Sequence, residues 1–301
     1  MQTELEYRLQ LFVNREDEMQ KFYEMLDSCE KPEDDSKAVI MVWGDSGLGK
    51  SSLLARMIHE CALRKFHKSE LVWTQTRNHD YMYIMRKIRD DMGVEYFNRF
   101  TDLINYFTTS NYELKIKIEN NGSIEVAKDA QIKDSDINDI AGIIIKDLNV
   151  TVPRPDQEIT EDERMMRLTD LFVDDLAEAT KDATLIVFFD AIEKMTSKTE
   201  AWVLNELLGA VRDGRLSNIR FVLCGQKKPV DIEEWPWMVE EAELKPLERK
   251  YIIEYLTKLN VDESSRESLA DMLLVVTNGY ADKVAKSVEA FLRIQEKNAN
   301  D

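Results

Sequence analysis

The chain has 301 residues, of which 44% are hydrophobic and 33% are charged, a composition typical of a folded protein rather than a disordered one. Its formal net charge of -18 argues against a surface built throughout to bind nucleic acid, because phosphate neutralisation needs clustered Lys and Arg; only a local basic patch stays open. No apolar run approaches the roughly 20 residues that cross a bilayer, and the N-terminus is too polar for a secretory signal. We therefore expect a cytoplasmic protein without a membrane partner.

The first part of the chain predicts a strand, a loop, a helix and a second strand. A short amphipathic helix within residues 14–26 precedes an apolar strand at 38–43. A glycine-rich loop then leads into a helix at 50–63, and another apolar strand follows at 70–76. This βαβ order indicates a parallel sheet.

The middle of the chain changes its hydrophobic period. Helical patterns at 80–92 and 96–107 are followed by apolar and polar residues that alternate on both sides of 120–123, the sequence Asn-Asn-Gly-Ser. This alternation predicts a β-hairpin. We interpret residues from about 112 to 153 as a β insertion that decorates the sheet edge.

The later elements return to the α/β pattern and then become entirely helical. A helix from about 162 to 180 leads into the continuous apolar run 184–190, which is typical of a strand buried on both faces. A helix at 199–214 and a buried strand at 218–225 follow. From 244 onward the pattern is that of amphipathic helices, so we expect a core domain at 1–240 and a small helical lid domain at 241–301.

The loop after the first strand reads WGDSGLGKSS and satisfies the pattern G-x-x-x-x-G-K-[ST]. A glycine-rich turn aims successive backbone N–H groups at phosphate oxygens, and the helix that follows offers its positive N-terminus. Lys50 supplies a charge for the β- and γ-phosphates, and the Ser51 hydroxyl is the expected Mg²⁺ ligand. The predicted nucleotide-binding residues of this loop are Gly44, Asp45, Ser46, Gly47, Leu48, Gly49, Lys50, Ser51 and Ser52. The fold class is therefore α/β, a P-loop NTPase with a three-layer αβα core, a parallel sheet, a β-hairpin insertion and a C-terminal helical lid.

Two carboxylates close to the end of the run 184–190 are candidates for the chemistry of a bound phosphate. Asp190 ends the strand and is the expected second Mg²⁺ ligand, with a role as a turn cap as the alternative. Glu193 is the nearest further carboxylate and could orient the attacking water, with a solvated helix residue as the alternative. Lys50, Asp190 and Glu193 form the predicted catalytic set. Ala191 stands where many hydrolysing relatives carry a second acid, which favours slow turnover.

With these motifs the chain resembles the STAND class of AAA+-related P-loop ATPases, which includes NACHT-type and apoptotic-ATPase-type domains. The segment LFVNREDEMQKF is similar to the class motif F-V-G-R-E-x-E-L, which lies against the adenine. Asn14 replaces the usual glycine, and the matching residues are Phe12, Val13, Arg15, Glu16 and Glu18. The resemblance implies that Val13, Asn14 and Arg15 bind nucleotide.

The resemblance continues into the last strand and the lid. Gln226 lies near the place of the sensor residue by the γ-phosphate, and Pro246 matches the proline that packs on adenine. Ala281 stands where a proline is common in the lid motif T-x-G-x-P. The class implies an ATP- and ADP-binding switch with Mg²⁺, in which nucleotide state controls lid movement and oligomerisation. It implies homo-oligomers or protein partners, and a setting in bacterial signalling or antiviral defence.

Two other function classes stay open at this point. A ring-forming AAA+ remodelling motor or assembly regulator needs an arginine supplied to the neighbouring γ-phosphate, and the candidates are Arg212, Arg215 and Arg220. A non-catalytic interaction module would use nucleotide only for stability.

Overall fold

The computed structural model describes residues 7, 9–30, 37–73, 80–108, 113–118, 124–131, 160–229 and 235–300. The chain divides into two compact units, and the first combines residues 1–96 with 176–301. The second unit consists of residues 97–175.

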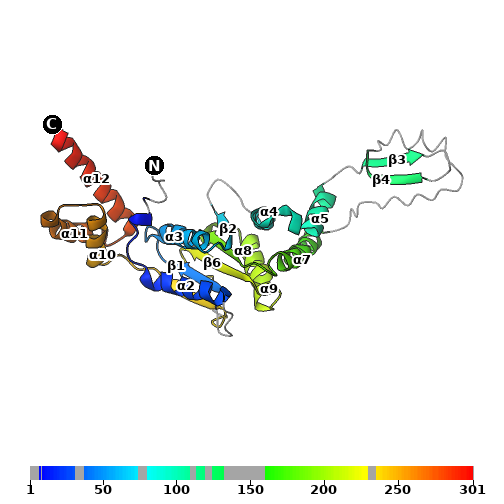
Figure 1. The fold of residues 1–301 in the computed structure, drawn as a ribbon, viewed down its shortest axis with the longest axis horizontal. Coiled ribbons are helices and arrows are strands. Elements are labelled where there is room, and N and C mark those ends of the chain that lie inside the picture. The colour runs from blue at the N-terminus through cyan, green and yellow to red at the C-terminus, as the bar shows by residue number, and fades with distance from the viewer. Residues whose placement is uncertain are drawn as a thin grey trace. The chain divides into compact units, whose positions relative to one another are not determined.

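A five-stranded parallel sheet, of which Figure 1 labels β1, β2 and β6, forms the centre of the first unit. Its strand order is β2-β5-β6-β1-β7. The register places Trp43 beside Gly225 and Asp190 beside Cys224, so the carboxyl ends of three strands meet at one edge. The predicted α/β fold with a parallel sheet is confirmed. The strands are β1 (Val39–Trp43), β2 (His67–Val72), β5 (Leu185–Asp190), β6 (Ile219–Gly225) and β7 (Val239–Glu243).

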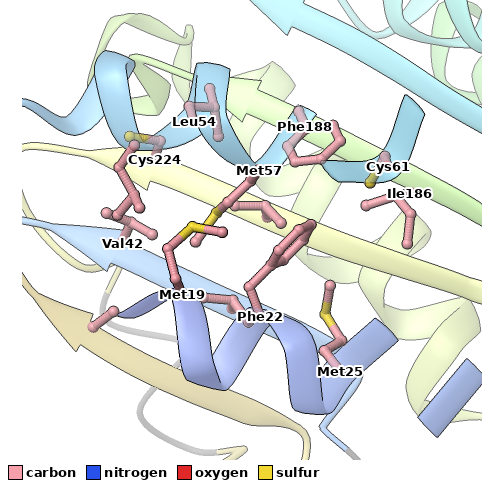
Figure 2. Packing of buried hydrophobic residues seen from close by; sticks show 14 of the residues in the cluster. Met19, Phe22, Met25, Val42, Leu54, Met57, Cys61, Ile186, Phe188 and Cys224 are labelled. Carbon is pink, nitrogen blue, oxygen red and sulfur yellow. The ribbon is translucent and has the colours of Figure 1, made fainter. Parts of the chain in front are cut away.

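One face of this sheet is covered by α2 (Glu16–Glu30) and α3 (Lys50–Leu63). Figure 2 shows side chains of both helices converging on strand side chains, among them Phe22, Met57 and Phe188, which are almost completely buried. Strand residues of the opposite parity, such as Phe189 and Phe221, are buried too. Burial of alternate residues on both faces explains why β5 and β6 read as unbroken apolar runs.

The other helices of this unit follow the predicted pattern, with one irregularity. The predicted helix at 199–214 contains a π-helical stretch between two short α-helices. These elements are α4 (Tyr81–Met92), η1 (Val94–Tyr96), η2 (Ile192–Lys194), α8 (Ser197–Ala201), the π-helix η3 (Trp202–Leu207) and α9 (Leu208–Arg212).

Two strands differ from the sequence expectation. The strand expected at 70–76 begins earlier, at His67, and ends at Val72, whereas 74–79 lie outside the described residues. The edge strand β7 was not predicted, because its sequence VEEAE is acidic and only Val239 and Ala242 are buried. Its pairing with β1 extends the sheet three residues beyond 240.

The second unit contains α5 (Asn98–Thr108), the strands β3 (Glu113–Ile118) and β4 (Ile124–Gln131), and most of α7 (Glu161–Ala179). β3 and β4 pair antiparallel, as expected for the predicted hairpin. The predicted turn at 120–123 and the rest of the expected insertion, 132–153, lie outside the described residues. Between the helices, the buried carboxylate of Asp175 accepts hydrogen bonds from the backbone N of Phe100 at 3.0 Å and from Arg99 Nε at 2.7 Å.

The three C-terminal helices are α10 (Arg249–Lys258), α11 (Glu263–Thr277) and α12 (Ala281–Asn300), and we call them the lid after the predicted lid domain. The lid has a hydrophobic cluster of its own, centred on Ile252, Leu256 and Val288. Within the described ranges, we find no helix whose length and apolar character would let it cross a membrane.

None of the three cysteines, all of which lie within the described residues, forms a disulfide, and they should differ sharply in reactivity. Cys61 and Cys224 are fully buried, and burial raises the pKa of the Cys61 thiol to about 12 and also raises the pKa of Cys224. At pH 8 both therefore hold less thiolate than an ordinary cysteine. We expect a thiol reagent to modify half-buried Cys29 rapidly and the other two only after unfolding, measured by absorbance with and without denaturant. Rapid native labelling that persists in Cys29→Ser would contradict this.

Candidate functional site

The predicted phosphate-binding loop joins β1 to α3 at the carboxyl edge of the sheet. Gly44, Gly47 and Gly49 have φ values of 147°, 86° and 93°, which side chains rarely tolerate. A Cβ atom at Gly44 would also lie 2.9 Å from the carbonyl oxygen of Leu244. The glycines therefore allow the loop to adopt backbone conformations that other residues rarely adopt, and Gly49 is the N-cap of α3.

Lys50 is folded over its own loop. Its Nζ donates to the carbonyl oxygens of Gly44 and Asp45, both at 2.8 Å. The side chains of Asp45 and Ser46 are exposed beside it, whereas Leu48 is buried. The ammonium group thus lies where the loop offers its backbone N–H groups to an anion.

Ser51 and Asp190, 139 positions apart, are in direct contact: the Ser51 hydroxyl donates to Asp190 Oδ2 at 3.0 Å. Both side chains present oxygen atoms, the ligand type that Mg²⁺ prefers. The pair fits the predicted metal site, and Ser51 and Asp190 would hold the ion against the phosphates of a nucleotide. Across the described residues, no cluster of three or more His, Cys, Asp or Glu side chains offers a separate metal site.

Glu193 and Gln226 are paired with each other. The Gln226 backbone N donates to Glu193 Oε2 at 3.2 Å, and Gln226 Nε2 donates to Glu193 Oε1 at 3.1 Å. The turn that carries Glu193 begins at Ala191, whose φ of 61° places a non-glycine residue in the left-handed region. Sequence reasoning named both partners but missed their contact, which no local pattern encodes.

A pocket of about 250 Å³ lies between the N-terminal segment, the phosphate-binding loop and the lid. Of the predicted site residues, Val13, Arg15, Leu48, Gly49 and Ser52 line it. Its other walls were not among the predicted nucleotide-binding residues, although Phe12 and Ala281 belong to the motifs that the resemblance pointed to. These walls are largely apolar: Leu11, Phe12, Leu247, Tyr255, Ala281, Asp282, Val284 and Ala285.

Two nucleotide-site expectations differ in detail from this geometry. Pro246 is exposed and does not line the pocket; its neighbour Leu247 does, because the backbone N of Leu247 is tied to the carbonyl of Gly279 at 2.7 Å. Asn14 lines a neighbouring, more polar pocket of about 450 Å³. Its φ of 62° lies in the left-handed region, which explains why the motif usually has glycine at this place. Asparagine also tolerates this region, so it can take the place of the glycine.

Arg15 is 5% exposed and joins three segments. Its Nη2 donates to the carbonyl oxygens of Leu48 at 2.7 Å and Lys245 at 2.9 Å, and Nη1 lies 3.6 Å from Glu18. Burial lowers the pKa of the guanidinium, which Glu18 and Glu16 partly offset. Arg15 therefore supports the pocket wall by tying the N-terminal segment to the loop and to the chain before the lid.

The first turn of α12 touches the phosphate-binding loop directly. The backbone N of Asp282 donates to the carbonyl of Gly47 at 3.0 Å, and the Tyr280 hydroxyl donates to Asp45 Oδ2 at 2.9 Å. Asp45 raises the pKa of Tyr280. A Cβ atom at Gly49 would lie 3.5 Å from Ala281 Cβ, so the lid helix packs closely on the loop.

Two of the arginines considered for a neighbouring site have intramolecular partners. Arg212 pairs with Asp213 and lies over the ring of Trp235, and Arg220 donates to the carbonyls of Ser217 and Ile219. Both lie at the amino-terminal approach to β6, at the opposite end of the strand from Gln226.

The parallel sheet, the glycine loop with Lys50 and the contact between Ser51 and Asp190 define a P-loop NTPase domain. The family model described as the KAP family P-loop domain matches residues 15–232, more than half of the chain. The chain therefore belongs to the KAP family of P-loop NTPases. The family implies a nucleotide ligand with Mg²⁺.

The chain is similar in structure to two solved proteins of low sequence identity. The chain is 14% identical to Cdc6p from Pyrobaculum aerophilum, with a TM-score of 0.51 and coverage of 95% of this chain and 65% of that one. It is 11% identical to domain III of the replication initiation protein DnaA from Thermotoga maritima, with a TM-score of 0.48 and coverage of 100% and 93%. At these identities the similarity concerns the fold alone. No curated protein matches the sequence at a significant level.

Proposed function

We propose that the protein is an ATP- and ADP-dependent switch of the STAND type with slow ATP hydrolysis. The observation that carries this proposal is the contact of the lid with the phosphate-binding loop, through Asp282 to Gly47 and Tyr280 to Asp45. A ligand shifts a conformational equilibrium only by its differential affinity for the two states. The loop residues that bond to the lid, Gly47 and Asp45, lie in the same loop as the groups that would bind phosphate. In this proposal, nucleotide binding and the lid contacts therefore affect each other.

The pocket beside Gly49 supports an adenine nucleotide. Its walls are largely apolar, and it adjoins the loop that would hold the phosphates, so a flat base can lie there while its phosphates reach Lys50. In this proposal Val13 and Leu247 pack against the base, and Lys50, Ser51 and Asp190 hold the phosphates and Mg²⁺. Slow turnover is supported by Ala191 in the place of a second acid.

Oligomerisation belongs to the same proposal. Opening of the lid in the ATP state would free the surface that now packs against the loop, and a second copy or a separate protein partner would bind there. The mass of the particle with ADP and with a non-hydrolysable ATP analogue tests this step, and a monomer in both states would remove oligomerisation from the proposal.

Hydrogen exchange at the backbone amide of Asp282 reports the lid movement, because this N–H donates to the carbonyl of Gly47 in the loop. We expect hydrogen exchange measured by mass spectrometry to be faster in 280–284 with the ATP analogue than with ADP. Tyr280→Phe removes only the hydroxyl that donates to Asp45 and should speed this exchange in the ADP state by about twofold to tenfold, the effect of one hydrogen bond.

The matched control is Tyr106→Phe, which removes an exposed hydroxyl carried by α5. This variant should leave exchange in 280–284 unchanged. Equal protection of this segment with ADP and with the ATP analogue would show that the lid does not respond to nucleotide.

A further inference from the structure

We propose that Gln226 is a positioning residue that restrains Glu193 and thereby keeps hydrolysis slow. This inference rests on the proposed function, because it assumes that Glu193 serves the attacking water. It differs in sign from the expectation for a residue that senses phosphate: removing the Gln226 amide should raise turnover, not lower it.

The first support is the completeness of the pairing. Both carboxylate oxygens of Glu193 accept a hydrogen bond from Gln226, one from the backbone at 3.2 Å and one from the side chain at 3.1 Å. A carboxylate that accepts two bonds from one neighbour is turned toward that neighbour. Each oxygen keeps a further lone pair that could accept from water, so the two bonds do not block Glu193 but fix the direction in which its carboxylate faces.

The second support is the packing of the turn that carries Glu193. A Cβ atom at Gly225 would lie 2.6 Å from Ile192 Cγ1 and 3.3 Å from Glu193 Oε2, so η2 rests directly on the end of β6. Ala191, with its φ of 61°, directs the chain into this position. The backbone conformation therefore places Glu193 beside Gln226, whichever rotamers the two side chains adopt.

The third support is the place of this pair in the sheet. β6 lies between β5, which ends at Asp190, and β1, which leads into the phosphate-binding loop. Gln226 directly follows β6, so the restraint acts at the carboxyl edge where Ser51 meets Asp190.

The chemical step defines what the restraint opposes. In hydrolysis the water oxygen bonds to the γ-phosphorus, the bond from that phosphorus to the β–γ bridging oxygen breaks, and ADP leaves. The proton lost by water passes to Glu193, whose carboxylate must turn a lone pair toward that water to receive it. While Gln226 fixes the orientation of the carboxylate, fewer enzyme molecules are arranged for this transfer.

The test is Gln226→Met, which keeps the length of the side chain and removes the amide. We expect kcat for Mg-ATP to rise about threefold to tenfold, the effect of one lost hydrogen bond, with KM changed by less than about twofold. Gln226→Asn, which restores an amide, should return kcat toward the wild-type value. The matched control is Gln20→Met, since Gln20 donates to Glu24 in a similar exposed pair on α2.

Two results would overturn the restraint. One is an unchanged or lower kcat in Gln226→Met. The other is a rise in kcat that is equally large when Gln226→Met is added to Glu193→Gln, because that variant has no Glu193 carboxylate to release. Binding of a fluorescent ATP analogue to each variant is measured first. Absence of binding in the wild-type protein would defeat the proposed function, whereas binding without any gain in turnover defeats the restraint alone.

Discussion

Replacing Lys50 with alanine is expected to weaken binding of Mg-ATP by about tenfold to hundredfold while leaving the fold intact. A hydrogen bond from a charged donor contributes about 1.5–3 kcal/mol, and Lys50 is the lysine of the phosphate-binding loop. Its Nζ already lies over the loop, bonded to the carbonyls of Gly44 and Asp45. Titration with a fluorescent ATP analogue measures the loss, and thermal unfolding without nucleotide tests the fold.

Lys37→Ala is the matched control, because Lys37 Nζ also donates to a backbone carbonyl, that of Pro236, at 2.7 Å. Lys37 lies just before the amino end of β1, away from the carboxyl edge that carries the loop. Its loss should leave the dissociation constant unchanged. Equal affinity of Lys50→Ala and the wild-type protein would mean that the loop does not bind phosphate through this side chain.

The phosphate-binding loop was predictable because its signal is local. The glycine spacing, the preceding strand and the helix that begins at Lys50 follow one another in the chain, and α3 has the predicted bounds. Asp190 was found for a related reason: it ends an apolar run, and strands of a parallel sheet end at a shared edge.

The features that the sequence did not reveal depend on partners far along the chain. β7 is held by β1 rather than by an apolar pattern of its own. Arg15 is a predicted nucleotide-binding residue and lines the pocket, but no motif indicates its hydrogen bonds to the carbonyls of Leu48 and Lys245. The pairing of Glu193 with Gln226 likewise requires knowledge of how η2 packs on β6.

The pocket walls illustrate the same limit at the lid. The motif match pointed to Pro246, yet the side chain that enters the pocket belongs to the next residue, Leu247. A shift of one residue in an extended segment turns a side chain to the other side. The hydrogen bond between Leu247 and Gly279, which joins two distant segments, helps to determine which residue of this segment lines the pocket.

The contact between Leu247 and Gly279 leads to the second large effect: Gly279→Ala is expected to destabilise the lid by about 2–5 kcal/mol. Gly279 has a φ of 72°, and a Cβ atom there would lie 2.4 Å from the carbonyl oxygen of Leu247. An L-residue in the left-handed region costs about 1–2 kcal/mol, and forcing extra volume into a packed site costs about 1–3 kcal/mol more. Because Leu247 also lines the pocket, we expect weaker nucleotide binding as well.

Gly214→Ala separates the two causes. Gly214 has a similar φ of 77°, but a Cβ atom there would have no neighbour within 4 Å, so only the backbone cost of about 1–2 kcal/mol applies. Hydrogen exchange in α10, α11 and α12 measures the local stability of the lid. It does not require that the whole chain unfold in a single cooperative step. Gly279→Ala should speed exchange throughout these helices, whereas Gly214→Ala should leave it unchanged. Lid exchange at the wild-type rate in Gly279→Ala would mean that the approach of Leu247 does not hold the lid in place.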